Sequence, residues 1–386
     1  MYSGAAMPSA SIGSDQPVVR EISPVPAPSG RVAWVDVSRV LVMLGTVLAH
    51  TPVDDSWKSL LALTSPGRMC LLFAVAGYFM ARRCTPGVLF PHWGRAVRMA
   101  AAYALLVCLY MLPLGWGFEG PRPGEGFAMS AMRFLLSLVM IADNPPVPLW
   151  FLRDLLLLTL ACSLFAWLGR RRMLYPLILL CLLLGLETSS SKFELGGWLV
   201  THPRSVAFFA LGMALTNISL ASVAAWLKRW SLLLAPAALG LVIFERGTLS
   251  VLEPLGIVAY MTLSLIAALW LERVLPALAR GVARFGETVF FVYVLHLPVL
   301  KAIELGLSTC SVDAARLPAG FWLALAPVVY LAVHALGMAI KRCSPELFGI
   351  LAIRPPKHKS VASAGVPRGN GALQAAEDSV PERETP

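Results

Sequence analysis

Long apolar blocks, separated by short polar stretches, make up most of the chain. They cover residues 33–50, 67–81, 97–115, 149–168, 173–187, 204–218, 231–245, 250–271, 287–304 and 319–340. A helix needs about 20 mainly apolar residues to cross a hydrocarbon layer of about 30 Å, and several blocks approach or exceed that length. The pattern therefore predicts an all-α, polytopic membrane helical bundle with about ten transmembrane helices, some of them short.

A further, moderately apolar stretch at 128–142 decides the topology. The basic clusters on which the choice depends are Arg82, Arg83, Arg95, Arg98 and Arg170 to Arg172. If 128–142 crosses the membrane, the last cluster lies on the opposite side from the others. If it stays at the surface or re-enters, all of them lie on one side, as the positive-inside rule prefers. We therefore predict that 128–142 does not cross and that both termini are cytoplasmic.

The two ends of the chain differ from the apolar blocks in composition. Residues 1–30 are rich in Pro, Ser, Gly and Ala and lack the apolar residues of a core. They also lack the basic, apolar and cleavage regions of a signal peptide. We expect a disordered tail over 1–30, a membrane domain over 31–342, and a largely disordered cytoplasmic tail over 343–386.

Composition and charge support this membrane setting. The 386 residues are 57% hydrophobic and 14% charged, with a mean hydropathy of +0.71, whereas soluble proteins are about 25% charged. The formal net charge of +10 indicates basic residues gathered on one side of a membrane, which argues against a nucleic-acid partner. We expect a multi-pass protein of the cell inner (plasma) membrane, with the lipid bilayer as its surroundings.

Three ionisable residues lie on one face of the block 33–50. Arg39 and His50 are separated by ten residues, which places them about 16 Å apart along a helix axis, and Asp36 stands one turn before Arg39. An ionisable side chain at the centre of a membrane helix costs about 2.5–3.5 kcal/mol, so the stripe needs a polar interior. We infer that it lines a cavity that takes a substrate.

The chemistry of this stripe favours a catalytic role. His50 at a helix end is either an interfacial residue or a general base that takes the proton of a hydroxyl attacking a thioester. The co-facial Asp36 and Arg39 favour the general base. Arg39 has two interpretations of equal weight: it neutralises Asp36, or it binds a phosphate or polarises the thioester oxygen. Asp36 orients Arg39. The sequence shows no Ser-His-Asp or Cys-His pairing, which favours direct transfer over an acyl-enzyme.

The stripe and three later segments together resemble the membrane acyltransferase-3 family. The segments are the run from Arg68 to Gly-Tyr78, Leu149-Trp-Phe-Leu-Arg-Asp154, and Gly286 to Pro298 with its Tyr-x-x-His. The chain departs from the family at Ala76, where Ser is common. The resemblance covers about residues 31–342. It implies transfer of an acyl group, most often acetyl from acetyl-CoA, to hydroxyls of cell-surface glycans and some small molecules.

Six further residues become candidates for binding substrate in this context. They are Arg68, Tyr78, Trp150, Arg153, Tyr293 and His296. For Arg68 and Arg153 the alternative is snorkelling to the membrane surface, and Asp154 is expected to find a different partner because neighbours in sequence do not share a helix face. Trp150 is by default an aromatic-belt anchor, and stacking on a sugar ring is the alternative. Tyr293 and His296 share a face and form either a core pair or part of the acyl channel.

The other polar or reactive residues of note are four arginines, the cysteines and four histidines. Arg82, Arg83, Arg95 and Arg98 mark the topology and lie where the phosphates of CoA would arrive, since the sequence contains no Gly-rich phosphate loop. The seven cysteines lack the spacing of a disulfide framework or of a metal site, so we expect no metal. The other histidines, His92, His202, His334 and His358, are interpreted as loop, surface or packing residues.

These observations predict an integral membrane O-acyltransferase. Cytoplasmic acetyl-CoA would be its co-substrate, and its acceptor would be a hydroxyl of an extracytoplasmic or lipid-linked polysaccharide or oligosaccharide. The alternative is a transporter or flippase, a class that commonly shows two similar halves with paired broken helices. The sequence shows no such repeat. It leaves the acceptor, the acyl chain and the oligomeric state open.

Overall fold

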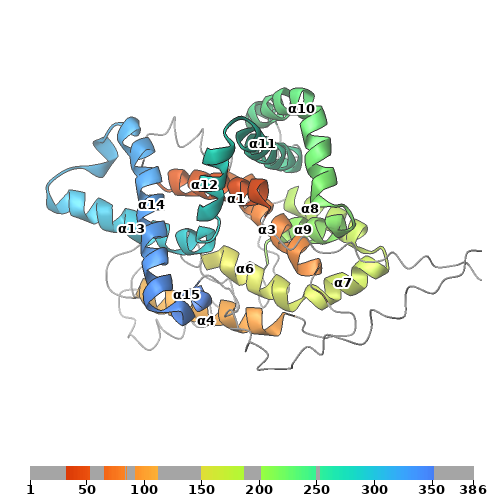
Figure 1. Cartoon of the computed structure of the whole chain (residues 1–386), viewed down its shortest axis with the longest axis horizontal. Helices are drawn as coiled ribbons and strands as arrows, with labels where there is room; N and C mark the ends of the chain where they lie inside the picture. Colours follow the sequence, from red (N-terminus) through yellow and green to blue (C-terminus); the bar gives the residue numbers. More distant parts are fainter. Residues whose placement is uncertain are drawn as a thin grey trace, which may run out of the picture.

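The structure, a computed structural model, describes residues 32–52, 65–82, 84, 92–111, 149–186, 201–248 and 253–351. Every regular element in these ranges is helical (Figure 1). The helices are α1 (Ala33–Ala49), α3 (Ser65–Ala81), α4 (Trp93–Met111), α6 (Leu149–Leu160), α7 (Cys162–Arg170), α8 (Leu174–Leu186), α9 (Pro203–Ala214), α10 (Leu220–Thr248), α11 (Glu253–Val274), α12 (Pro276–Phe285), α13 (Val289–Thr309), α14 (Ala319–Cys343) and α15 (Pro345–Leu351), with 3-10 turns η1 (Leu215–Asn217) and η3 (Ala314–Arg316). The predicted all-α class is confirmed.

Each of the ten predicted blocks coincides with helical structure, but these helices differ in whether they are long enough to cross a membrane. Among the described residues, four helices are long and apolar enough to cross a membrane: α10, α11, α13 and α14. A fifth span results if α6 and α7, bent by 55° at Ala161, count as one. The total of about ten spans and the orientation of the termini stay predictions. The stretch 128–142, Arg83, the tail 1–30 and residues 352–386 lie outside the described ranges.

Helix α1 lies at the centre of the bundle. It packs against α3, α11, α12, α13 and α14 (Figure 1). Because neighbours surround it, even polar residues of α1 such as Asp36, Ser38 and Thr46 are buried. Ser38 and Thr46 satisfy their hydroxyls by donating to backbone carbonyls of the preceding turn. The charged stripe predicted from the sequence therefore faces protein rather than lipid.

Helices α3 and α9 cross at backbone contact. A Cβ atom built on Gly212 would lie 1.9 Å from the carbonyl oxygen of Ala74, and one built on Gly77 would lie 2.1 Å from that of Phe209. No side chain fits at either position. Small residues that allow such close approach are typical of helix crossings in membranes. The crossing ties α9, which begins beside the candidate site, to the centre of the bundle.

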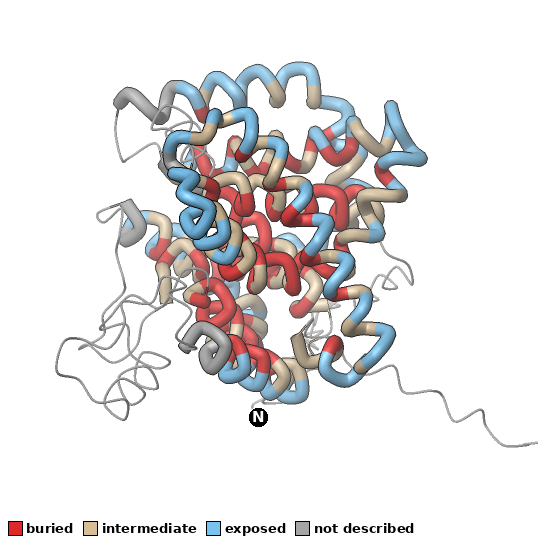
Figure 2. Tube along the Cα trace, turned by 90° about the vertical axis from the view of Figure 1, so that its left-hand side faces the viewer, coloured by how far each residue is buried: buried red, intermediate tan, exposed pale blue. Residues whose placement is uncertain are grey.

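The outer helices expose large apolar side chains. Figure 2 shows buried residues on the inner turns and exposed residues around the periphery. On α10 the exposed fractions of Leu232 and Ile243 are 80% and 60%, and Leu179 of α8 and Val328 of α14 are also exposed. Apolar surface this extensive is unusual on a water-soluble monomer. It fits helices that face lipid.

Candidate functional site

The first half of α1 holds an ion pair. The Nη1 atom of Arg39 donates to Oδ1 of Asp36 at 3.0 Å, which confirms the predicted contact between these residues. Asp36 rests against Gly286, where an added Cβ would lie 2.8 Å from the Asp36 Cβ. The carboxylate is therefore clamped between the guanidinium and the backbone that joins α12 to α13.

The other end of α1 carries a pair of histidines. The ring of His50 lies 5.3 Å from the ring of His296 on α13, at an angle of 43°. The Nδ1 atom of His296 lies 2.7 Å and 3.1 Å from the carbonyl oxygens of Tyr293 and Val292, so it must carry the ring proton. Its Nε2 is buried and has no hydrogen-bond partner among the described residues. His296 therefore offers an unused acceptor in the ring beside His50.

Arg68 adds a buried cation at this end. Its side chain is 2% exposed, and its guanidinium donates to the carbonyl of Gly45 in the last turns of α1. Tyr260 of α11 packs against Gly67, beside Arg68. Of the two interpretations of Arg68, burial excludes snorkelling. The positive charge of Arg68 therefore lies at the end of α1 that carries His50, where it is available for an oxyanion that develops there.

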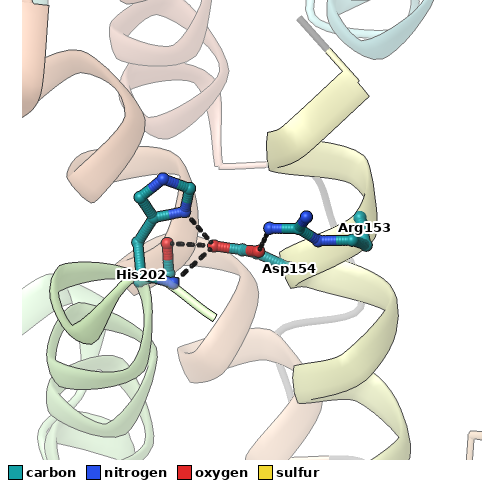
Figure 3. Close-up of polar contacts among 4 residues, drawn as sticks. Arg153, Asp154 and His202 are labelled. Carbon is teal, nitrogen blue, oxygen red and sulfur yellow. Dashed lines mark hydrogen bonds and ion pairs between the residues drawn. The ribbon is translucent and has the colours of Figure 1, made fainter. Parts of the chain in front are cut away.

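Arg153 and Asp154 contact each other, contrary to the sequence prediction. The Nη2 atom of Arg153 donates to Oδ1 of Asp154 at 2.8 Å, and both side chains are buried. The prediction was wrong because both residues are shielded from water, and the long arginine side chain can fold back over its own helix to meet the adjacent carboxylate. The other carboxylate oxygen, Oδ2, accepts from Ser205 Oγ at 2.9 Å and from His202 (Figure 3).

His202 is a candidate site residue that the sequence analysis missed. Its Nδ1 donates to Asp154 Oδ2 at 2.8 Å and its backbone N–H donates to the same oxygen at 3.1 Å (Figure 3). His202 lies in the connection before α9, in line with its interpretation as a loop residue, but its bond to Asp154 was not predicted. A carboxylate bound to Nδ1 fixes the ring and leaves Nε2 for a substrate, which is the arrangement of a carboxylate-oriented general base. The only hint in the sequence is its place before Pro203, which starts α9.

A continuous series of rings joins the two histidine centres. The centroid distances are 5.3 Å for His50–His296, 6.2 Å for His296–Tyr293, 4.9 Å for Tyr293–Phe151, 6.2 Å for Phe151–Trp150 and 4.6 Å for Trp150–His202. The series comes from α1, α13, α6 and the start of α9. Four predicted site residues, His50, His296, Tyr293 and Trp150, therefore belong to one series of packed rings. Trp150 packs on protein rings, so it is more than a belt anchor.

Tyr78 lies away from this series of rings. It lies about 15 Å along α3 from Arg68. Its hydroxyl donates to the carbonyl of Ile218 at 2.9 Å, and the guanidinium of Arg82 stacks on its ring at 4.8 Å. Tyr78 and Arg82 therefore belong to the opposite end of the bundle from His50.

The same end of α3 carries a cluster that the sequence did not suggest. Cys84 Sγ lies 3.0 Å from Cys162 Sγ and 3.6 Å from Nε2 of His92, and that nitrogen also lies 3.1 Å from the carbonyl oxygen of Met80. The contacts with Cys162 and His92 lower the pKa of the Cys84 thiol. Arg95 and Arg98, predicted to meet the phosphates of CoA, follow His92 in the first turns of α4. His92, too, is more than a surface residue.

The fold and the site define a helical membrane protein with a polar, histidine-containing interior. A family model described as an acyltransferase domain matches residues 32–338. The chain therefore belongs to the acyltransferase-3 family, and an acyltransferase type of activity follows from this membership. Comparison with curated proteins and with solved structures gives no match.

Proposed function

We propose that this protein transfers an acetyl group from acetyl-CoA to a hydroxyl of an extracytoplasmic or lipid-linked glycan, at the cell inner membrane. The observation that carries the proposal is the placement of His50 against His296, with the buried Arg68 bound to the last turns of the same helix, at the opposite end of α1 from the Asp36–Arg39 pair. One end supplies a base and a cation for acyl transfer. The other supplies guanidinium groups suited to the phosphates of the donor.

The separation within α1 supports one of the two chemical roles considered for Arg39. Arg39 and His50 are about 16 Å apart along the axis, so they cannot both contact one thioester. If His50 serves the reacting carbonyl, Arg39 holds a more distant part of the donor. Polarising the thioester oxygen then falls to Arg68, whose guanidinium reaches the last turns of α1.

The reaction is written as a direct transfer. A glycan hydroxyl oxygen attacks the thioester carbonyl carbon while His50 takes the hydroxyl proton. The developing oxyanion is stabilised by Arg68. When the tetrahedral intermediate collapses, the C–S bond breaks, and the CoA thiolate leaves and receives the proton. The products are the glycan ester and free CoA, with His50 again neutral.

His202 is a second candidate for the general base. A carboxylate binds the Nδ1 atom of His202. Among the described residues, no carboxylate binds His50 in this way. The side chain of His202 is 32% exposed, so a substrate can reach the ring. The ring of Trp150 packs beside it at a tilt of 58° and would suit the apolar face of a sugar. This geometry favours a role in holding or activating the acceptor.

The decisive experiment uses the purified full-length protein in detergent with acetyl-labelled acetyl-CoA and glycan from the source membrane. We expect release of free CoA and labelled ester on the glycan. His50→Ala should abolish both, whereas His202→Ala should mainly raise the acceptor concentration needed. Intact acetyl-CoA in the presence of the acceptor would contradict the proposal and favour the transporter alternative. Glycan analysis of a strain that lacks the gene should show one missing ester.

A further inference from the structure

The cluster of Cys84, His92 and Cys162 has no part in the proposed transfer. Its three donor atoms, two sulfurs and a ring nitrogen, lie within 4.8 Å of one another. Cys84 follows α3, His92 immediately precedes α4, and Cys162 begins α7 at the 55° bend. We propose that this cluster binds one Zn²⁺ ion.

The spacing of the donor atoms fits tetrahedral zinc. With Zn–S of about 2.3 Å and Zn–N of about 2.0 Å, a sulfur and a nitrogen ligand lie about 3.5 Å apart, and two sulfurs about 3.8 Å. The Cys84 Sγ to His92 Nε2 distance is 3.6 Å. The two sulfurs, now 3.0 Å apart, need to separate by less than 1 Å. Cys84 lies outside any helix and is the ligand able to make that movement.

The chemistry of the donor set selects the metal. Two thiolates and an imidazole are borderline-soft ligands that suit Zn²⁺ and are poor ligands for Mg²⁺ or Ca²⁺. A disulfide between Cys84 and Cys162 is the competing outcome. It would have to form at the end of the bundle predicted to be cytoplasmic, where thiols stay reduced.

The position of the cluster indicates what the ion does. Bound zinc would join the end of α3, the start of α4 and the break between α6 and α7. Arg82 lies two residues before one ligand, and Arg95 lies three residues after another. The ion would therefore hold the basic end of the bundle together. His92 Nε2 would exchange its contact with the Met80 carbonyl for the metal.

The test measures zinc in the purified full-length protein, kept in detergent under reducing conditions, by mass spectrometry of the metal. We expect about one zinc ion per chain in the unmodified protein. Cys84→Ser, Cys162→Ser and His92→Ala should each lose it. Cys181→Ser is the matched control, because Cys181 is a buried free cysteine of α8 outside the cluster, and it should keep its zinc.

A second measurement does not depend on the variants folding. In the unmodified protein, stripped with a chelator, added zinc should protect the partly exposed Cys84 from alkylation and leave the exposed Cys310 as reactive as before. Cobalt should give a thiolate-to-metal absorption band. The proposal is overturned if the reduced protein takes up no zinc, if uptake is the same in the serine variants, or if fresh protein carries a Cys84–Cys162 disulfide.

Discussion

His50 of α1 and His296 of α13 place their rings 5.3 Å apart in the interior of the bundle. The proton on His296 Nδ1 is held by backbone carbonyls, so its buried Nε2 is an acceptor beside His50. A buried acceptor without a partner is costly in a folded protein, and such atoms are often found where a substrate completes the site. The pair is therefore the reference point for testing the proposed chemistry.

The first prediction concerns His50. His50→Ala should lower acetyl transfer by about 10²–10⁴-fold, the usual effect of losing a general base. Transfer is measured as labelled ester on the glycan. The variant should keep the expression level and the thermal unfolding midpoint of the unmodified protein. Near-normal transfer would mean that His50 is not the base and would move that role to His202.

The second prediction separates charge from shape at Arg39. Lysine keeps the positive charge that balances Asp36 but loses the planar guanidinium. If Arg39 holds the donor, Arg39→Lys should lose about 1.5–3 kcal/mol of binding, or roughly 10–100-fold in the affinity for acetyl-CoA. Titration calorimetry with CoA measures this. An Arg39 that only neutralises Asp36 would tolerate the change with full affinity and activity.

The third prediction tests the contact of Asp36 with Gly286. Gly286→Ala places a methyl group 2.8 Å from Asp36 Cβ, which displaces the carboxylate that holds Arg39. We expect a loss of about 1–3 kcal/mol in the free energy of unfolding, together with reduced transfer. Gly281→Ala is the matched control, because nothing lies within 4 Å of the added methyl on the same segment. Equal stability of the two variants would show that Gly286 does not clamp Asp36.

The fourth prediction concerns the buried carboxylate of Asp154. Asp154→Asn leaves the buried Arg153 without its charged partner and should cost about 3–5 kcal/mol of unfolding free energy. Ser205→Ala removes one neutral donor to the same carboxylate and should cost about 1 kcal/mol. Denaturant or thermal unfolding in detergent compares the two variants. A similar small loss in both would argue that Asp154 is not the centre of this network.

The fifth prediction fixes the topology. A cysteine introduced at Asn144 should react with a membrane-impermeant reagent from outside intact cells, and one at Arg171 should not. The reason is that 128–142 is predicted not to cross, which keeps the basic clusters on one side. Parallel labelling after permeabilisation shows that both positions can react. The opposite pattern would reverse the proposed sidedness of transfer.

Local relationships along single helices were predictable from the sequence. Because a helix buried in lipid needs a long apolar run, apolar length located the helical regions to within a few residues. The exception is α10, which begins well before its predicted block. The Asp36–Arg39 ion pair followed from spacing of one helical turn. Helix α12, with Arg280 and Arg284 one turn apart, was missed because it is too short and polar to be recognised as a membrane span.

Relationships between distant helices were settled by packing alone. His202 reaches Asp154, and Cys84 reaches Cys162, because α3, α6 and α9 pack together. Single-sequence periodicity assigns a face to each residue and says nothing of which helix that face will meet. The Arg153–Asp154 pair shows the same limit at short range. Helical spacing predicts separate partners, but the burial that makes the two side chains pair exists only in the assembled bundle.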